Sequence, residues 1–339
     1  MKVILTLIAS LFLIQISIGQ RISKEDRLIL KKKEDSLKAS AYIILNGRTT
    51  EESLVADSQF TRLLVKALKV KNSFYYPFDS LITISKLIPP DSSFRIITWQ
   101  LQLGEDKTRQ HGAIQMRTQD GSLKLFPLID KSEFVERIGD TIANNLGWIG
   151  AVYYRIIQKS AFDKTYYTLL GYDENNARIN RKIVDVLTFQ NGEPIFGGPY
   201  FSFPNSGFSQ KFTHRYVMEY KKHAGPRLHY DEEEDMIVIE HLISESGEPE
   251  RKETLVPDGD YDALKWINGK WVYITKLFTS KLQDGQAPVP NPIKENDGQF
   301  NIKEMDKDLE DVEEEGTTTG TDSTTIKTKK TKTKKKKGE

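Results

Sequence analysis

The stretch that decides the fold covers residues 148–189 and reads WIGAVYYRIIQKSAFDKTYYTLLGYDENNARINRKIVDVLTF. It is rich in β-branched and aromatic residues, which suit a pleated, half-buried surface. Alternation at the two-residue period predicts three consecutive strands, over residues 148–158, 165–170 and 182–189. A helix would need apolar residues at steps of three and four, and would not favour so many β-branched neighbours.

The first of these strands predicts a sheet that is covered on both sides. Trp148, Val152, Tyr154 and Ile156 share one face, and Ile149, Ala151, Tyr153, Arg155 and Ile157 share the other. Because both faces are mostly apolar, we expect residues 148–158 to form a central strand with packing on either side. In the third strand, Val184 and Val186 share one face, and Ile183, Asp185, Leu187 and Phe189 share the other.

Composition sets limits on function. The chain has 339 residues, a formal net charge of +1 and no cysteine. A nearly neutral chain has no overall field that would steer it toward nucleic acid, and nucleic acid is not an expected partner. Without cysteine there is no disulfide framework, thiolate metal site or cysteine nucleophile, so the folded core alone must stabilise the protein. No cofactor is expected.

The first 19 residues predict a secretory signal peptide. Lys2 supplies a positive charge, residues 3–16 are apolar except for three polar positions, and small residues precede an expected cleavage between Gly19 and Gln20. The apolar run is shorter than the ~20 residues that span a bilayer. We therefore expect an exported protein, periplasmic or secreted to the cell surface, with no transmembrane segment in the mature chain.

Residues 20–283 predict one α+β domain, with N-terminal helices packed on a predominantly antiparallel β-sheet. Ser23 begins a first helix, and Thr49 with Glu52 forms a capping box for a second helix over about residues 51–70. Two further elements are expected by similar reasoning. They are a short strand at residues 41–45 and a helix at residues 130–145.

Three later segments carry turn and loop signals. Asp120-Gly121 predicts a hairpin that pairs Met116 with Leu125. Residues 192–207 predict a long loop with exposed aromatic side chains. Residues 284–339, which are acidic and then rich in lysine, predict a disordered tail.

Asn268-Gly269 is the strongest hairpin signal in the chain. It places Trp266 opposite Trp271, with Tyr273 on the same face. These three aromatic residues are a candidate ligand-binding platform for a glycan or peptide. Paired tryptophans on one hairpin face are nevertheless more often part of a core, because large aromatic side chains are mostly buried.

Seven short segments carry a resemblance to known sequences: YPFDSL at residues 76–81, FRI at 94–96 with Thr98-Trp99, GAIQ at 112–115, YTLLGY at 167–172, VDVLTF at 184–189, VPDG at 256–259 and NGKW at 268–271. Through these segments the chain resembles a family of uncharacterised exported proteins from Bacteroidota. The resemblance covers most of residues 50–275 and excludes the tail. It implies an exported, β-rich envelope or secreted protein and assigns no catalytic residue.

A metal site is the alternative hypothesis. His214, His229, Asp231 and His241 are of the types that bind zinc, but their spacing matches no zinc-hydrolase motif and HExxH does not occur. The simpler interpretation is that they are strand and loop histidines near acidic residues.

The run from Asp258 to Asp262 has aspartate at alternate positions, as at the start of a calcium loop. Ala263 stands at the sixth position, where an EF-hand needs glycine, and Gly269 at the twelfth, where it needs glutamate. An EF-hand is excluded. A polar turn before the last hairpin is expected, and looser calcium binding at that turn is the alternative.

These features favour a non-catalytic binding or structural protein of the cell envelope, whose partner is an envelope protein or a glycan. The stretch from Lys327 to Lys337 carries eight lysines and is a candidate contact with an anionic surface, although a solubilising tail is the simpler interpretation. The alternative function is a metal-dependent hydrolase that uses the segment from His214 to His241.

Overall fold

A computed structural model describes residues 22–104, 107–204 and 212–277. The predicted signal peptide with its cleavage position at Gly19 and Gln20, and the predicted tail including Lys327 to Lys337, lie outside the described residues. No helix in the described part of the chain combines the length and apolar character needed to cross a membrane.

Two α-helices come first, as expected: α2 (Lys24–Asn46) and α3 (Thr50–Leu68). The Thr49 hydroxyl accepts a hydrogen bond from the Glu52 N–H at 3.2 Å, which confirms the cap of α3. The short strand predicted at residues 41–45 is wrong. Ala41 and Ile44 continue the buried helical stripe begun by Leu30 and Leu37, so packing against α3 extends the helix.

The helix-side sheet is antiparallel and has the order β1-β2-β3-β4. Ile97, Trp99 and Leu101 of β2 pack against the two helices, whereas Phe94 and Ile96 point to the opposite face. Its strands are β1 (Ser85–Leu87), β2 (Phe94–Gln102), β3 (Thr108–Met116) and β4 (Lys124–Ile129).

The β3–β4 register differs from the prediction by one residue. Met116 lies opposite Lys124, and Leu125 lies opposite Gln115. The connection is longer than a two-residue hairpin, and the Gly121 carbonyl accepts a hydrogen bond from the Asn72 N–H at 2.9 Å. A contact distant in sequence has therefore fixed the turn.

The middle sheet contains the three predicted strands. Its order is β5-β9-β8-β7-β6, and β12 pairs with the other half of the β8 edge. Ile183 and Leu187 of β8 face the helix-side sheet, while Val184 and Val186 face the outer sheet. The central position predicted for residues 148–158 is wrong, because that strand, β6, ends the strand order of the sheet, and Tyr154 and Arg155 are exposed. Its strands are β5 (Ala143–Asn144), β6 (Val152–Ala161), β7 (Lys164–Asp173), β8 (Ile179–Gln190), β9 (Glu193–Phe196) and β12 (Tyr216–Lys221).

The outer sheet has the order β11-β10-β16-β15-β14-β13. All its pairs are antiparallel except β10 with β16. Trp266 lies opposite Trp271, which confirms the register predicted from Asn268-Gly269. Its strands are β10 (Phe201–Ser202), β11 (Phe212–Thr213), β13 (Leu228–Asp231), β14 (Met236–Ser244), β15 (Leu255–Ile267) and β16 (Lys270–Ile274).

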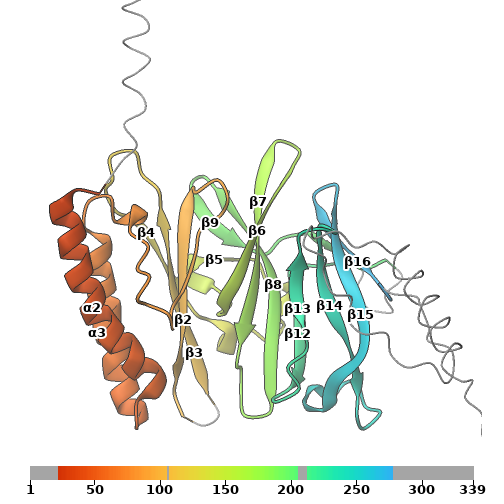
Figure 1. Ribbon diagram of the computed structural model, residues 1–339. Coiled ribbons are helices and arrows are strands. Elements are labelled where there is room, and N and C mark those ends of the chain that lie inside the picture. Colours follow the sequence, from red (N-terminus) through yellow and green to blue (C-terminus); the bar gives the residue numbers. More distant parts are fainter. Residues whose placement is uncertain (1–21, 105–106, 205–211, 278–339) are drawn as a thin grey trace, which may run out of the picture. The chain divides into compact units, whose positions relative to one another are not determined.

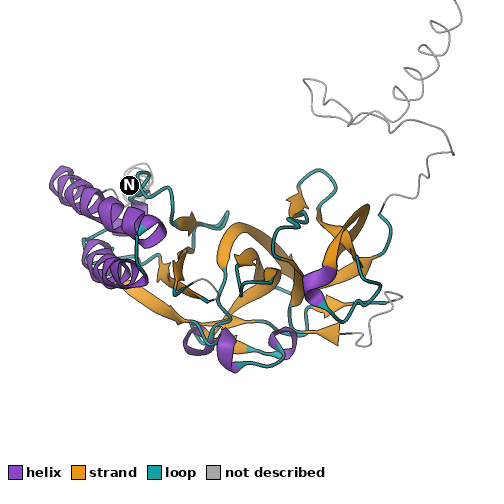
Figure 2. Cartoon of the chain, turned by 90° about the horizontal axis from the view of Figure 1, so that it is seen from below, coloured by secondary structure: helices purple, strands orange, loops and turns teal. Residues whose placement is uncertain are grey.

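The elements stack as helices, helix-side sheet, middle sheet and outer sheet (Figure 1). Figure 2 shows the same succession seen from below, with the two long helices at one end. Single-turn helices complete the fold: η2 (Ser73–Tyr75), η3 (Ser132–Phe134), η4 (Ile138–Asp140), η5 (Asn145–Gly147) and η6 (Lys252–Thr254).

The helix predicted at residues 130–145 is wrong. The segment contains η3, η4 and the short strand β5 instead. The Asp130 carboxylate, the expected helix cap, does accept from Ser132 N–H, but it also accepts from the backbone N–H groups of Gln110 and Gly150. It thereby ties β3 to the start of the middle sheet.

The loop with exposed aromatics predicted at residues 192–207 is also wrong. Phe196 is buried among the residues between the helix-side and middle sheets. Phe201 and Phe203 are buried between the middle and outer sheets, because the parallel pairing of Phe201 with Trp271 draws the segment into that interface.

Candidate functional site

A groove lies where the middle and outer sheets separate, between β12 on one side and β14 and β15 on the other. Its volume is about 660 Å³. At the opposite end of the same interface, aromatic side chains including Trp271 fill the space between the sheets. The two sheets therefore pack closely at the aromatic end of their interface and leave a groove at the other end. We call it the β12–β15 groove.

A β-bulge shapes the outer-sheet wall of the groove. Glu240 pairs with Tyr261 and Leu242 pairs with Pro257, so one residue of β14, His241, faces three residues of β15. The middle residue of the three is Gly259, whose φ of 92° lies in the region that favours glycine. Bulges re-aim side chains, and this one gathers two aspartates of the alternating run around His241.

His241 is held by one of these aspartates. Its Nδ1 lies 2.8 Å from the Asp258 carboxylate. The imidazole side chain is 44% exposed, whereas the Asp258 side chain is 18% exposed. The contact with Asp258 fixes the ring through one nitrogen and leaves the other, Nε2, for water or a ligand.

A second carboxylate is anchored deeper in the same wall. Asp262 is buried, accepts a hydrogen bond from the Tyr273 hydroxyl at 2.5 Å and another from the Lys276 N–H at 2.9 Å. Burial raises the pKa of Tyr273 far above its usual value, and Tyr216 and the Asp262 carboxylate raise it further. The phenol therefore stays protonated and acts as a fixed donor.

Aromatic rings from the two walls contact each other. Tyr216 of β12 stacks on Tyr273 and on Phe203, with ring centroids 6.2 Å apart in each pair. Burial also raises the pKa of the Tyr216 phenol. The ring pair gives the groove an apolar surface among charged side chains.

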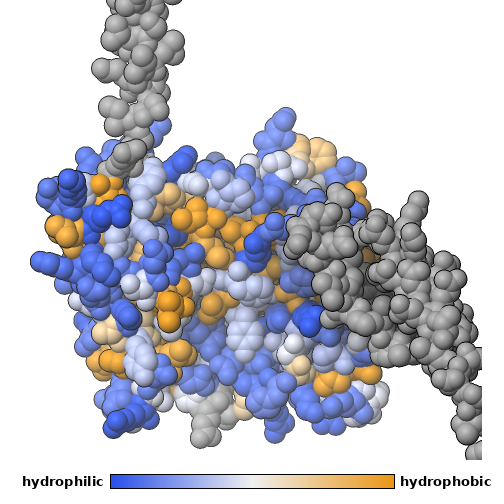
Figure 3. Space-filling model, in the orientation of Figure 1, coloured by the Kyte–Doolittle hydropathy of each residue, from blue (hydrophilic) through white to orange (hydrophobic). Residues whose placement is uncertain are grey.

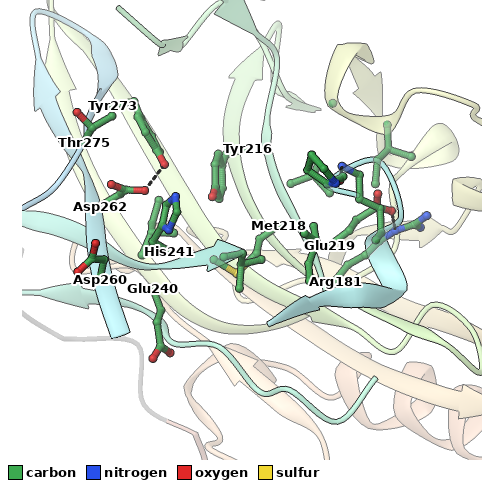
Figure 4. A pocket seen from close by; sticks show the side chains of 18 of the residues that line it. Arg181, Tyr216, Met218, Glu219, Glu240, His241, Asp260, Asp262, Tyr273 and Thr275 are labelled. Atoms are coloured by element: carbon green, nitrogen blue, oxygen red, sulfur yellow. Dashed lines mark hydrogen bonds and ion pairs between the residues drawn. The ribbon is translucent and has the colours of Figure 1, made fainter. Parts of the chain in front are cut away.

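The middle-sheet wall carries an ion-paired arginine. Arg181 Nε donates to Glu219 at 2.7 Å, and its NH1 lies 3.6 Å from Asp173. Burial raises the pKa of Asp173, while its hydrogen bonds and the Arg181 charge oppose that shift. Figure 4 shows both walls with their labelled side chains: Asp260, Asp262, His241 and Tyr273 toward one end, Arg181, Met218 and Glu219 toward the other, and Tyr216 between them.

A buried ion pair fixes β12 next to the groove. Arg215 and Asp185 are both almost fully buried, and Arg215 Nε donates to Asp185 at 3.2 Å. Arg215 NH1 also donates to the carbonyl of Ile138, which lines the groove, and to the carbonyl of Thr141. Burial raises the pKa of Asp185, and the Arg215 charge opposes the shift.

The predicted aromatic platform of Trp266, Trp271 and Tyr273 is not a surface platform. Trp271 is fully buried, and its indole N–H donates to the Thr168 hydroxyl at 2.8 Å. Trp266 packs on Trp271 and on Tyr166. Tyr273 is the one of the three that lines the groove.

The predicted metal-ligand set is not assembled. His214 precedes β12, His229 and Asp231 lie on β13, and His241 lies at the bulge of β14. Among the described residues, no group of three or more His, Asp or Glu side chains is placed to hold a metal ion. The set was chosen by proximity in sequence, and the fold spreads it over the β11–β12 connection and two strands of the outer sheet.

The sequence interpretation missed most of the groove residues. Arg181, Tyr216 and Glu219 belong to strands whose pairing is distant in sequence, and no local motif marks them. The aspartates at 258, 260 and 262 did give a signal, but they were interpreted as a turn. All three lie in β15. Asp258 and Asp260 lie at the bulge opposite His241, and Asp262 is buried.

In the space-filling view, hydrophobic residues form patches among hydrophilic ones (Figure 3). Compared with protein-family models, curated proteins and solved structures, the chain shows no significant match.

Proposed function

We propose that this is an exported, non-catalytic binding protein of the cell envelope or of the secreted fraction, and that the β12–β15 groove is its ligand site. The observation that carries the proposal is the groove itself. Its polar side chains are held in place before any ligand arrives, by Asp258 on His241, Glu219 on Arg181 and Asp262 on Tyr273. Preorganised contacts reduce the entropy that binding must overcome.

Export rests on the first 19 residues of the sequence. Expressed in a bacterium with a Sec pathway, the protein should appear in the periplasm or medium with its N-terminus at Gln20. Intact mass spectrometry of that fraction measures the cleavage directly. An uncleaved chain retained in the cytoplasm contradicts export and leaves the groove hypothesis standing.

The second candidate function is hydrolysis. The specific observation in its favour is the His241–Asp258 pair, because an imidazole oriented by a carboxylate can act as a general base. The hypothesis of a metal-dependent hydrolase required one ligand set of His214, His229, Asp231 and His241. Within the described residues these side chains do not form such a set.

Native mass spectrometry can test binding and hydrolysis together. Purified protein is incubated with the low-molecular-weight fraction of an envelope hydrolysate, and the bound compound is released and weighed. Thr275→Trp fills the exposed groove rim and should abolish the adduct, whereas Lys38→Trp on the exposed face of α2 should not.

The state of the released compound separates the two functions. A compound recovered with unchanged mass supports binding. A compound cleaved by the natural chain but not by His241→Ala supports hydrolysis and overturns the non-catalytic proposal. An adduct that survives Thr275→Trp overturns the assignment to the groove.

A further inference from the structure

We propose that the ligand of the β12–β15 groove is a neutral oligosaccharide. The inference rests on the proposed function and names the chemical class that this groove recognises. Three features carry it: the exposed part of an aromatic stack, carboxylates and donors around that stack, and a balance of charge along the lining.

The aromatic stack offers a sugar ring its apolar partner. Tyr216 lines the groove with part of its side chain exposed, and it stacks on Tyr273 and Phe203. The face of an aromatic ring is electron-rich, and the C–H groups on one side of a pyranose are weakly positive and nearly flat. A sugar ring can thus lie on Tyr216, while an extended aliphatic ligand gains less from so small a surface.

Hydrogen-bonding groups of both kinds surround the stack. Within the described part of the chain, the Asp260 carboxylate has no hydrogen-bond or ion-pair partner, and His241 keeps Nε2 after its contact with Asp258. Carboxylates accept strong charge-assisted hydrogen bonds from hydroxyls. The Arg181 guanidinium, already bound to Glu219, supplies donors on the opposite wall. The adjacent hydroxyls of a sugar, each of which can donate and accept a hydrogen bond, match this mixture of acceptors and donors.

The charge of the lining argues against a strongly charged ligand. Five carboxylates and four lysine or arginine side chains line the groove, together with His241. A polyanion would meet the carboxylates and a polycation the basic groups, and like charges brought together in a site disfavour binding. A neutral ligand meets neither penalty. The volume of about 660 Å³ falls within the usual range of small-ligand sites and suits a short oligosaccharide segment.

Isothermal titration calorimetry on the mature chain tests the inference. The neutral probes are maltohexaose, cellohexaose, laminarihexaose and chitohexaose. The other probes are hexagalacturonate, hexalysine and an uncharged serine-rich hexapeptide. At least one neutral oligosaccharide should bind, with the charged probes and the peptide weaker by about tenfold or more.

Variants locate the binding. Tyr216→Leu removes the ring and should weaken binding by about tenfold, and Tyr216→Phe, which keeps the ring, should weaken it less. Tyr230→Leu is the matched control, since Tyr230 is also a strand tyrosine at the same sheet interface but does not line the groove. Thermal melting of each variant shows whether it is folded. Both Tyr216 variants lack the hydroxyl, so the ratio of their dissociation constants reports the contribution of the ring alone.

The outcomes separate the inference from the proposed function. Binding of the peptide or a charged probe alone, lost in Thr275→Trp, overturns the oligosaccharide and keeps the groove as a binding site. Binding of an oligosaccharide that Tyr216→Leu and Thr275→Trp leave intact overturns the inference by placing the ligand elsewhere. Failure of every probe, with no adduct in native mass spectrometry, overturns both.

Discussion

The helix side of the molecule and the rim of the β12–β15 groove use acidic residues in opposite ways. On the helix side, Glu34 is buried and accepts from the Tyr76 hydroxyl at 2.6 Å and the Ser80 N–H at 2.7 Å. On the groove side, Asp258 and His241 are partly exposed and Asp260 lies at the rim. The Glu34 carboxylate thus makes its hydrogen bonds within the fold, whereas the side chains at the groove can still make hydrogen bonds to a ligand.

This difference follows from how the layers close. The helices and the helix-side sheet meet along a continuous apolar cluster, so each polar group in that interface must find a partner inside the protein. The middle and outer sheets close along the aromatic part of their interface and separate at β12. Polar side chains at the opening can exchange water for a ligand without leaving a buried group unpaired.

The largest expected effect on stability concerns the buried ion pair that positions β12, one wall of the groove. Arg215→Ala should lower the free energy of unfolding by about 3–5 kcal/mol, because it leaves the Asp185 carboxylate buried without its counter-charge. Urea denaturation followed by circular dichroism measures the loss. Replacing both residues at once, as Asp185→Leu with Arg215→Met, should cost less than Arg215→Ala alone. A loss below about 1 kcal/mol in Arg215→Ala would show that the pair does not support β12.

The next effect concerns the helix side. The Asp57 carboxylate accepts from the Trp99 indole N–H at 2.7 Å and lies 2.8 Å from His111 Nδ1. Asp57→Ala leaves a buried indole N–H unpaired and should cost about 1–3 kcal/mol in urea denaturation. Asp35→Ala on the exposed face of α2 has the same gain in helix propensity and is the matched control. Equal stability of the two variants would contradict the role given to Asp57.

The same contrast explains what could be predicted from sequence. The helix pattern at Thr49 and Glu52, the two faces of β8 and the Asn268-Gly269 hairpin depend on neighbours close in the chain, and the structure confirms each. The helix expected after Asp130 failed because that carboxylate is bound by Gln110 and Gly150, each 20 residues away. Local patterns do not encode such partners.

The groove lay beyond prediction for the same physical reason. Its walls come from β8, β12, β14 and β15, and β12 joins β8 through a pairing that spans Tyr216 with Val184 to Lys221 with Ile179. The bulge depends on a mismatch between two strands and is visible only once their register is known. The alternating aspartates were the part of the site that sequence could show.

A smaller, pH-dependent effect is expected in the outer sheet. Partial burial lowers the pKa of His229 below its usual 6.5, and the nearby Asp231 charge opposes the shift. The unfolded chain therefore binds more protons than the folded chain near that pH, so stability should fall as pH falls through about 6.5. His229→Asn should reduce the difference in urea midpoint between pH 7.5 and pH 5.5. An unchanged difference would assign the pH dependence to other groups.

The smallest expected effect on stability is the sharpest test of the contrast between the two sides. Asp260→Ala makes the same chemical change as Asp57→Ala, but its carboxylate is exposed at the groove rim and has no partner within the described residues. Its cost in urea denaturation should stay within about 0.5 kcal/mol. Its effect should appear instead in calorimetric titration with the neutral oligosaccharide that binds the natural chain, as weaker binding, because a ligand hydroxyl loses its charged acceptor. If Asp260→Ala cost as much stability as Asp57→Ala, the rim carboxylate would be a structural group like those under the helices, and the groove would lose the spare hydrogen-bonding capacity from which its function is inferred.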